Sequence, residues 1–387
     1  MIPPSFLGSI YTYPWDLRDE GIDRALDRIH DTGCREVMLA ASYHVSTYFL
    51  PHNPRRPIYW GEDGALYFQP NWARFKQAGI RPMVSSVVEG NGYMERMADS
   101  VRRRGLEFSA WLVYFYNHHL AENNPSLTRH DAFGNPYLGQ LSCGPEQMHE
   151  YAAALTADVL EKFNPAAVHV ESLHRMRWDY GFRNPKVLSP ISPQCQFLLG
   201  VDFNPRMRAQ WRGESDRLMR DVRDWLRPRL ERLPTAEDQA PAAGEWIERA
   251  FEGRLKSYLE ICQKRTTALW QTVSDMIHKA GARVQSGMAG PDNVWRTDLA
   301  VSSNIHLDRV TVSPGIPSPE VDRIQRQIRE RGAVLVSTQP GTMTEAGPLI
   351  NQVRSAKEAG CGGCTFYNYG LLREQQLGFI AEALRSV

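Results

Sequence analysis

Eight short apolar segments alternate along the chain with segments of helical periodicity. The apolar segments are rich in β-branched and aromatic residues and begin near residues 6, 36, 107, 166, 282, 308, 333 and 363. The segments between them carry apolar residues at helical spacing, as in Ile22, Ala25, Leu26 and Ile29. Strands that alternate with helices favour parallel β/α units, and no linker divides the eight units into two cores. The sequence therefore predicts an α/β fold, a single (β/α)8 TIM barrel over residues 1–387.

Three of the predicted connections between a strand and its helix are long. They follow the second, third and fourth strands, so we expect long insertions in βα loops 2, 3 and 4. The insertions at residues 44–92 and 175–252 lie within the one domain, and residues 56–68 look like a hairpin that turns at 62–64. A doubly wound sheet is the alternative, but no GxGxxG motif follows the first strand and no GxxxxGK[ST] motif occurs.

Composition argues against several kinds of partner. The net charge is +1, and the arginine-rich segments 102–104 and 326–331 lie in helix-like stretches that also carry acids, so we expect no nucleic-acid partner. No run of about 18 apolar residues predicts a membrane span, and the N-terminal residues lack the basic start of a signal peptide. The six cysteines are scattered in mostly apolar contexts, and the Cys361–Cys364 pair has no second pair to complete a metal site. This usage predicts reduced core thiols in a cytoplasmic protein.

Polar and aromatic residues gather where the predicted strands end. In a (β/α)8 barrel the βα loops converge at that end and build the active site. Tyr and Trp rings pack against the C–H faces of sugars while their polar tips bond hydroxyl groups, so these ends predict a carbohydrate site. The residues expected to bind substrate are Tyr11, Tyr13, Trp15, His44, Tyr114, Tyr116, Asn117, His118, His174, Trp178, Trp295, Gln339, Tyr367 and Asn368.

The segment AVHVESLH, Ala167–His174, ends the predicted fourth strand on a glutamate. Side chains alternate along a strand, so the two valines share one face while His169 and Glu171 share the other. Branched apolar residues suit the side that faces helices, which predicts that His169 and Glu171 point into the barrel, with Glu171 near the mouth. Glu171 is then held by neighbours such as Tyr114 or Asn117, or is protonated and able to donate a proton. The structural alternative is a strand cap, or an ion pair with Arg175 or Arg177.

Residues 106–175 resemble uncharacterised glycoside hydrolase-like (β/α)8-barrel proteins. The resemblance rests on an Asn-Pro start, an acidic-x-x-Gly turn, a Pro-Glu-led helix and a fourth strand that ends in Glu. Those features are Asn124-Pro125, Asp131 to Gly134, Pro145-Glu146 and Glu171. The resemblance implies a barrel fold, hydrolysis of glycosides and the acid/base role for Glu171.

A second acid is not evident at the end of the seventh strand, where retaining enzymes of this kind place a glutamate. The segment AVLVSTQPG offers only Thr338 and Gln339 there. Two-carboxylate catalysis needs a partner about 5–5.5 Å away for retention or roughly 6.5–9.5 Å away for inversion. Loop residues that could supply it are Glu89, Asp16, Asp179 and Asp292, and we favour Asp292 and Glu89 as the further catalytic residues. Asp16 has the position of a helix cap.

Two other functions fit the same barrel mouth. A metal-dependent sugar isomerase, epimerase or lyase could draw ligands from His44, His118, His119, Glu171 and His174. A non-catalytic carbohydrate-binding barrel would keep the aromatic residues without a second carboxylate. The favoured prediction is a glycosidase without metal or cofactor, whose partner is a small-molecule glycoside or oligosaccharide. The sequence leaves a homo-oligomer open.

Overall fold

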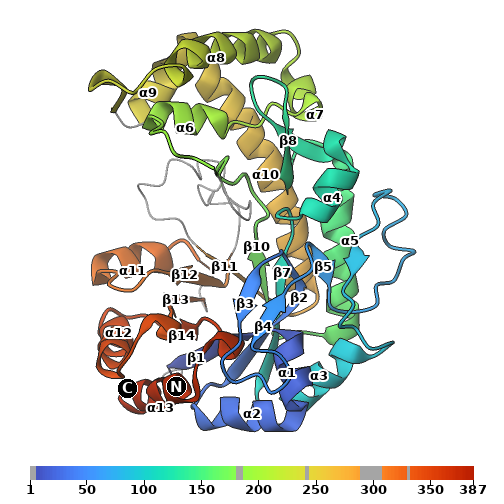
Figure 1. The fold of residues 1–387 in the computed structure, drawn as a ribbon, viewed down its shortest axis with the longest axis vertical. Coiled ribbons are helices and arrows are strands. Elements are labelled where there is room, and N and C mark those ends of the chain that lie inside the picture. The colour runs from blue at the N-terminus through green and yellow to red at the C-terminus, as the bar shows by residue number, and fades with distance from the viewer. Residues whose placement is uncertain (1–5, 180–185, 240–243, 288–306, 329–331) are drawn as a thin grey trace.

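The computed structural model describes residues 6–179, 186–239, 244–287, 307–328 and 332–387, and they contain a closed barrel of eight parallel strands (Figure 1). The strands pair in chain order, and the pairing of the first strand with the last closes the barrel. This confirms the predicted single TIM barrel. The barrel strands are β1 (Leu7–Thr12), β2 (Glu36–Tyr43), β7 (Glu107–Val113), β10 (Ala167–Glu171), β11 (Arg283–Gly287), β12 (Arg309–Val312), β13 (Ala333–Thr338) and β14 (Gly363–Phe366).

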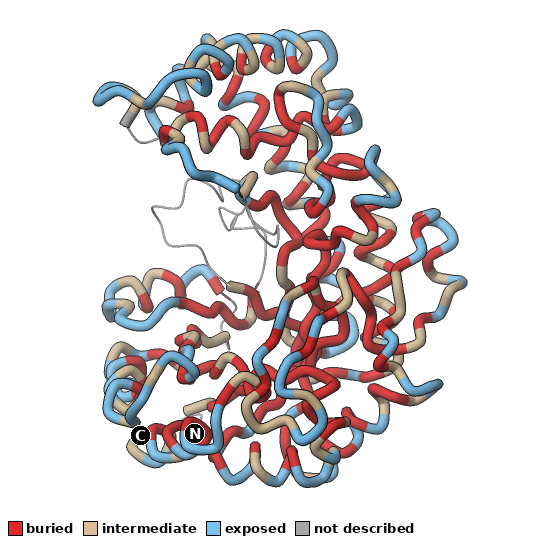
Figure 2. Tube along the Cα trace, viewed as in Figure 1, coloured by how far each residue is buried: buried red, intermediate tan, exposed pale blue. Residues whose placement is uncertain are grey.

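Helices surround the barrel and bury one face against the strands (Figure 2). The predicted helical spacing of Ile22, Ala25, Leu26 and Ile29 falls in α2, where the last three of these residues are buried. The helices of this outer layer are α1 (Pro14–Glu20), α2 (Ile22–Asp31), α3 (Tyr93–Arg103), α5 (Glu146–Phe163), α10 (Arg254–Lys279), α11 (Ser318–Gln325), α12 (Gly347–Glu358) and α13 (Glu374–Arg385).

Two apolar clusters lie on the two sides of the barrel strands, one outside the barrel and one inside it. The larger cluster joins Val168 and Val170 of β10 to helix residues such as Leu155 of α5. The smaller cluster contains residues of the opposite parity, including Met38 of β2 and Trp111 of β7. Since side chains alternate along each strand, the second set fills the interior of the barrel.

Charged residues close the N-terminal end of the barrel. Glu36 and Arg309 are the first residues of β2 and β12, and their side chains form a buried ion pair of 2.6 Å. Ser109 of β7 donates a hydrogen bond of 2.5 Å to the same carboxylate oxygen. These two contacts to Glu36 Oε1 offset part of the cost of burying the charge pair. The bottom of the barrel is thus filled, and the opposite end remains for a site.

The long βα loops carry their own secondary structure. Loop 2 contains the two-stranded ribbon β3 (Thr47–Phe49) and β4 (Ile58–Trp60), and the short strands β5 (Ala65–Leu66) and β6 (Met83–Val84). The predicted hairpin around residues 62–64 is therefore wrong. β4 pairs with β3, whereas β5 pairs with the end of β2, where Ala65 and Leu66 are buried. Burial against the barrel thus outweighs the local turn signal.

Loops 3 and 4 extend beyond the barrel strands. Loop 3 contains α4 (His118–Asn123) and the paired strands β8 (Thr128–His130) and β9 (Pro136–Leu141). The segment after β10 carries α6, α7, α8 and α9, which form a cap at the top of the view with the first part of α10 (Figure 1). These cap helices are α6 (Pro193–Leu199), α7 (Pro205–Arg208), α8 (Glu214–Leu230) and α9 (Gly244–Arg249).

All six cysteines are buried and free of disulfides, as predicted from their apolar contexts. Burial raises the pKa of the Cys361 thiol to about 11, so it is uncharged at neutral pH. Within the described ranges, no helix has the length and apolar character that a membrane crossing requires.

Candidate active site

A cavity of about 220 Å³ opens at the C-terminal end of the barrel strands. Its wall draws on strands all round the barrel, from β1 to the residue after β14, so it lies where a barrel fold concentrates its loops. The lining residues are Tyr11, Trp111, His169, Val170, Glu171, Ser172, His174, Ser286, Gly287, Thr311, Ser337 and Tyr367.

Glu171 ends β10 and points into the barrel, as its parity predicted. The indole Nε1 of Trp111 donates a hydrogen bond of 2.7 Å to Glu171 Oε2. The register of β7 and β10 sets Trp111 opposite His169, one inward position below Glu171, so the indole reaches up to the carboxylate. A hydrogen bond to an ionised oxygen is stronger than one between neutral groups. Trp111 therefore orients the carboxylate, in place of the expected Tyr114 or Asn117.

The backbone turns sharply directly after Glu171. Ser172 has φ of 57°, in the left-handed region that side chains other than glycine rarely occupy. Its carbonyl accepts from the Phe115 amide at 3.1 Å, and the Glu171 carbonyl accepts from the Tyr114 amide at 3.0 Å. These two bonds continue the ladder past the end of the strands. Unfavourable backbone conformations of this kind gather at functional sites, where the surroundings must hold them.

His169 lies one layer below Glu171 and is uncharged at neutral pH. Burial lowers the pKa of its imidazole to about 4. Its Nδ1 lies 3.3 Å from both the Tyr11 hydroxyl and the Gln285 Nε2. With the Gln285 amide in this orientation its nitrogen can only donate, so Nδ1 accepts and the ring proton resides on Nε2. The floor of the cavity is therefore neutral and polar.

Tyrosine hydroxyls form a chain at one side of the cavity. The Tyr367 hydroxyl lies 2.9 Å from that of Tyr13 and 3.0 Å from that of Tyr43. Burial raises the pKa of each of these phenols, and the negative field of Glu171 adds to the effect at Tyr43 and Tyr367. Phenols that stay protonated can donate hydrogen bonds but are poor nucleophiles. Glu171 is the one carboxylate among the described lining residues.

The structure brings several predicted site residues together. Tyr11, Glu171, His174 and Tyr367 line the cavity, and Tyr13 contacts it through Tyr367. Sequence reasoning missed Trp111, Ser172, Thr311 and Ser337. The parity of the segment EFSAWLV identifies Trp111, because it puts Ser109, Trp111 and Val113 on the inward face. The prediction drew mainly on positions that follow each strand, so it left out inward-facing residues within the strands themselves.

Two predicted residues of the third strand end have structural contacts elsewhere. The Tyr114 hydroxyl lies 2.9 Å from Thr156 Oγ1 on α5, so this ring points outward to the helix layer. Asn117 caps α4, where its Oδ1 accepts from the Leu120 amide at 2.8 Å. A helix start needs such a side-chain acceptor for its free amides. Neither residue lines the cavity.

The histidine and aromatic residues of the loops form a separate group. His44 is stacked between Tyr43 and Tyr116, with ring centroids 4.2 and 4.3 Å away, and burial lowers its pKa to about 4. His118 Nδ1 lies 2.6 Å from Asp63 Oδ2. His44 and His118 thus have loop contacts, and neither lines the cavity with Glu171 and His174. No cluster of three or more His, Cys, Asp or Glu side chains suited to a metal occurs in the described part of the chain.

The remaining predicted residues that the structure describes do not line this cavity either. Trp15 is fully buried and stacks on Tyr13 at 4.4 Å, and Gln339 is exposed after β13. Asn368 accepts from the Gly370 amide at 3.2 Å. Trp178 lines a different cavity, described below. Trp295 lies outside the described residues.

Three of the candidate second acids lie in the described part of the chain, and none of them lines the cavity with Glu171. The Glu89 side chain is 62% exposed and lies 3.8 Å from Arg18. Asp16 accepts from the Tyr13 amide at 3.0 Å as a helix cap, and burial raises its pKa to about 8. Asp179 pairs with Arg177 at 2.6 Å. Asp292 lies outside the described residues, so its role stays a prediction.

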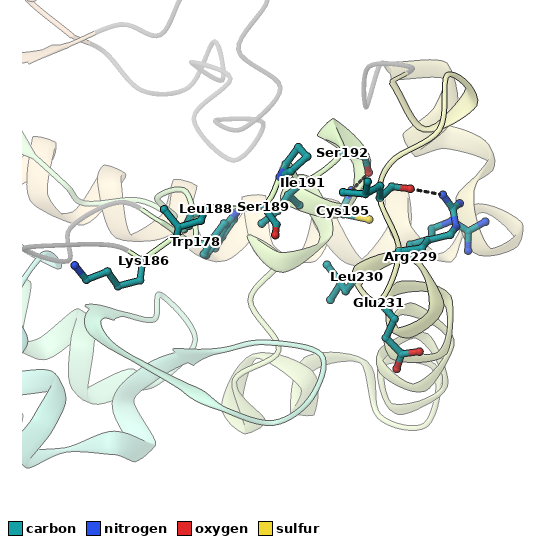
Figure 3. A pocket seen from close by; sticks show the side chains of 14 residues that line it. Trp178, Lys186, Leu188, Ser189, Ile191, Ser192, Cys195, Arg229, Leu230 and Glu231 are labelled. Carbon is teal, nitrogen blue, oxygen red and sulfur yellow. Dashed lines mark hydrogen bonds between the residues drawn. The ribbon is translucent and has the colours of Figure 1, made fainter.

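A larger cavity of about 540 Å³ lies in the cap, between α6 and the end of α8 (Figure 3). Trp178, Lys186, Cys195 and Arg229 are among the side chains that line it, and they come from no barrel strand. This cavity differs from the one at the strand ends in its position, because it lies in the cap and not at the ends of the barrel strands. The convergence of loops and polar groups points to the smaller cavity.

No protein-family model and no curated protein matches this chain. Solved structures do match it. The α-L-fucosidase isoenzyme 2 from Paenibacillus thiaminolyticus aligns with a TM-score of 0.57 at 8% identity over 98% of this chain and 49% of that chain. The β-galactosidase from the psychrophilic Marinomonas ef1 aligns with a TM-score of 0.57 at 10% identity over 98% and 59%.

The glycoside hydrolase domain of PgaB (BpsB) from Bordetella bronchiseptica aligns with a TM-score of 0.53 at 14% identity over 94% of both chains. The present chain spans 49% and 59% of the fucosidase and the galactosidase, but nearly all of this domain. At sequence identities this low, the likeness to these structures establishes the fold alone. The chain has the eight-stranded barrel fold of these glycoside hydrolases.

Proposed function

We propose that this protein is a carbohydrate-active enzyme that hydrolyses a glycosidic bond, with Glu171 as the acid/base residue. The observation that carries the proposal is a carboxylate at the strand ends, oriented by the Trp111 indole at 2.7 Å in a cavity with polar walls. A positioned carboxyl group can protonate a leaving oxygen or activate water. The fold likeness to glycoside hydrolases supports this class of reaction.

The cavity suits one sugar ring. Its volume of about 220 Å³ is below the roughly 300–1,000 Å³ of pockets that hold drug-sized ligands. The hydroxyl-bearing residues Ser286, Thr311 and Ser337 come from the neighbouring strands β11, β12 and β13. The aromatic rings of Tyr11 and Trp111 come from β1 and β7, which are outside this run of strands. Hydroxyl partners and aromatic faces together are what a sugar ring requires.

The second catalytic group is proposed to be Asp292. Among the described cavity-lining residues, Glu171 is the one carboxylate. In the sequence, Asp292 comes shortly after Gly287, which lines the cavity at the end of β11. The last described residue before Asp292 is therefore part of the cavity wall. The proposal for Glu89 is weaker, because that carboxylate is exposed beside Arg18.

Turnover of a panel of 4-nitrophenyl glycosides tests the assignment. We expect Glu171→Gln to lower kcat by at least 10²-fold, since general acid–base catalysis typically contributes about 10²–10⁴-fold. Binding of the glycoside, followed by ligand-observed NMR, should persist because the amide keeps the shape of the side chain. Glu382→Gln, at an exposed position of α13, is the control and should leave kcat unchanged. Unchanged turnover in Glu171→Gln would reject the role.

A non-catalytic sugar-binding barrel is the second candidate, because the described lining offers one carboxylate where two usually act. The same panel separates the two functions. Glycoside binding without turnover in the unaltered protein would favour the binding barrel, and loss of turnover in Asp292→Asn would favour the enzyme.

A further inference from the structure

The ribbon formed by β3 and β4 has one apolar face in solvent. Its strands pair Thr47 with Trp60 and Phe49 with Ile58, so these four side chains share one face. Trp60 is 72% exposed, Phe49 51% and Ile58 46%. Exposed aromatic and branched apolar side chains grouped in this way mark binding surfaces more often than isolated ones do.

The opposite face of the ribbon is fixed by stacked aromatic rings. Tyr48 and Tyr59 are buried and lie 5.1 and 4.6 Å from the ring of Trp15. Trp15 in turn stacks on Tyr13, whose hydroxyl contacts the cavity residue Tyr367. An isolated two-stranded ribbon is marginally stable in water, so these contacts hold it in place. The exposed face is therefore a rigid platform at the barrel mouth.

The platform is small and has polar groups at its edge. At their exposed fractions, the apolar side chains of this face together present on the order of 300–400 Å² of accessible surface. A stable protein interface buries ~800 Å² on each partner, which is more than twice this area. Thr47 adds a hydroxyl beside Trp60, and the guanidinium of Arg373 lies 5.7 Å from the Phe49 ring centre. Arg56 pairs with the buried Asp19 at 2.9 Å, which neutralises the adjacent charge.

We propose that this face is a second saccharide-binding site, at which Trp60 stacks on a ring of a neutral oligosaccharide or polysaccharide. The choice of a saccharide rests on the proposed function of the barrel. An indole face suits the C–H side of a sugar ring, and the Thr47 hydroxyl and Arg373 donors suit its hydroxyl groups. Binding here holds a chain beside the barrel mouth without entering the cavity.

Affinity electrophoresis tests the site in the full-length Glu171→Gln background, which limits turnover. The gels contain xylan, galactan, soluble starch or hydroxyethyl cellulose as neutral probes, and polygalacturonate as the charged probe. We expect at least one of the neutral probes to retard the protein, and Trp60→Ala to weaken that binding by roughly tenfold, the effect of losing one aromatic stack. Trp60→Phe should keep part of the retardation. Leu233→Ala is the matched control, because Leu233 is also 72% exposed but lies in the cap.

Several outcomes would overturn the site. They are equal retardation of Trp60→Ala and its parent, no retardation by any neutral polysaccharide, or retardation by polygalacturonate alone. Light scattering tests a further outcome. If the unaltered protein is a dimer and Trp60→Ala converts it to a monomer, the face binds a second copy of the chain and not a saccharide. Small 4-nitrophenyl glycosides separate this proposal from the previous one. Trp60→Ala in the unaltered background should leave their kcat/KM unchanged, whereas Glu171→Gln should abolish it.

Discussion

The indole nitrogen of Trp111 and a carboxylate oxygen of Glu171 are 2.7 Å apart, although the two residues are on different strands. A hydrogen bond to a charged group contributes about 1.5–3 kcal/mol. Trp111→Phe keeps an aromatic ring and removes the donor. We therefore expect kcat/KM for a cleaved glycoside to fall by roughly 10–100-fold, at about 1.4 kcal/mol for each factor of ten.

A matched variant separates this effect from lost packing. Trp270 is also buried, and its indole nitrogen has no hydrogen-bond partner among the residues that the structure describes. Trp270→Phe should lower the urea midpoint about as much as Trp111→Phe, with little change in kcat/KM. Equal kinetic losses in both variants would show that the Trp111 hydrogen bond has no specific role.

The buried imidazole of His169 should make stability depend on pH. Its pKa is about 4 in the folded protein against an ordinary value of 6.5, so the unfolded chain binds the proton first as the pH falls. The associated stability is present above about pH 6.5, declines down to pH 4 and is then constant, a change of about 3 kcal/mol. His169→Gln should flatten this part of a urea-denaturation profile. His30→Gln, at an exposed position of α2, should retain the full slope.

The left-handed conformation of Ser172 should make glycine favourable at this position. A residue with a β-carbon costs roughly 1–2 kcal/mol in this region, and glycine has no such cost. We expect Ser172→Gly to hold or raise the urea midpoint, and Ser172→Val to lower the free energy of unfolding by about 2 kcal/mol or more. The reverse order of the two variants would contradict the strain at this turn.

The buried Arg129 should position the segment that follows Glu171. Its guanidinium donates to the Met176 carbonyl at 2.6 Å, and also to the Gly200 carbonyl and Gln140 Oε1. Arg129→Met removes this donor from Gln140 Oε1 and the Met176 carbonyl, at about 1–3 kcal/mol each. The Gly200 carbonyl keeps a hydrogen bond from Arg175 at 2.9 Å. We expect faster hydrogen exchange in residues 172–179 and 193–200, with the barrel strands unchanged. Arg232→Met removes an exposed ion pair with Asp238 and should change neither region.

Local sequence patterns determined the eight strands, the helices of the outer layer and the inward direction of His169 and Glu171. Strand alternation and helical periodicity are set by neighbouring residues, so a single sequence contains them. The cap role of Asp16 was equally local, since it depends on the helix that begins beside it. The burial of the cysteines followed from their apolar neighbours.

Contacts between distant segments were decided only by the tertiary structure. The register of β7 and β10 placed Trp111 under Glu171, and the helix layer supplied Thr156 of α5 as the partner of the outward-facing Tyr114. The pairing of β5 with β2 replaced the hairpin expected within residues 56–68, and Asp63 became the partner of His118. Such contacts depend on strand stagger and on how long loops close, and the energy of burial against the barrel outweighs the local preferences that a sequence displays.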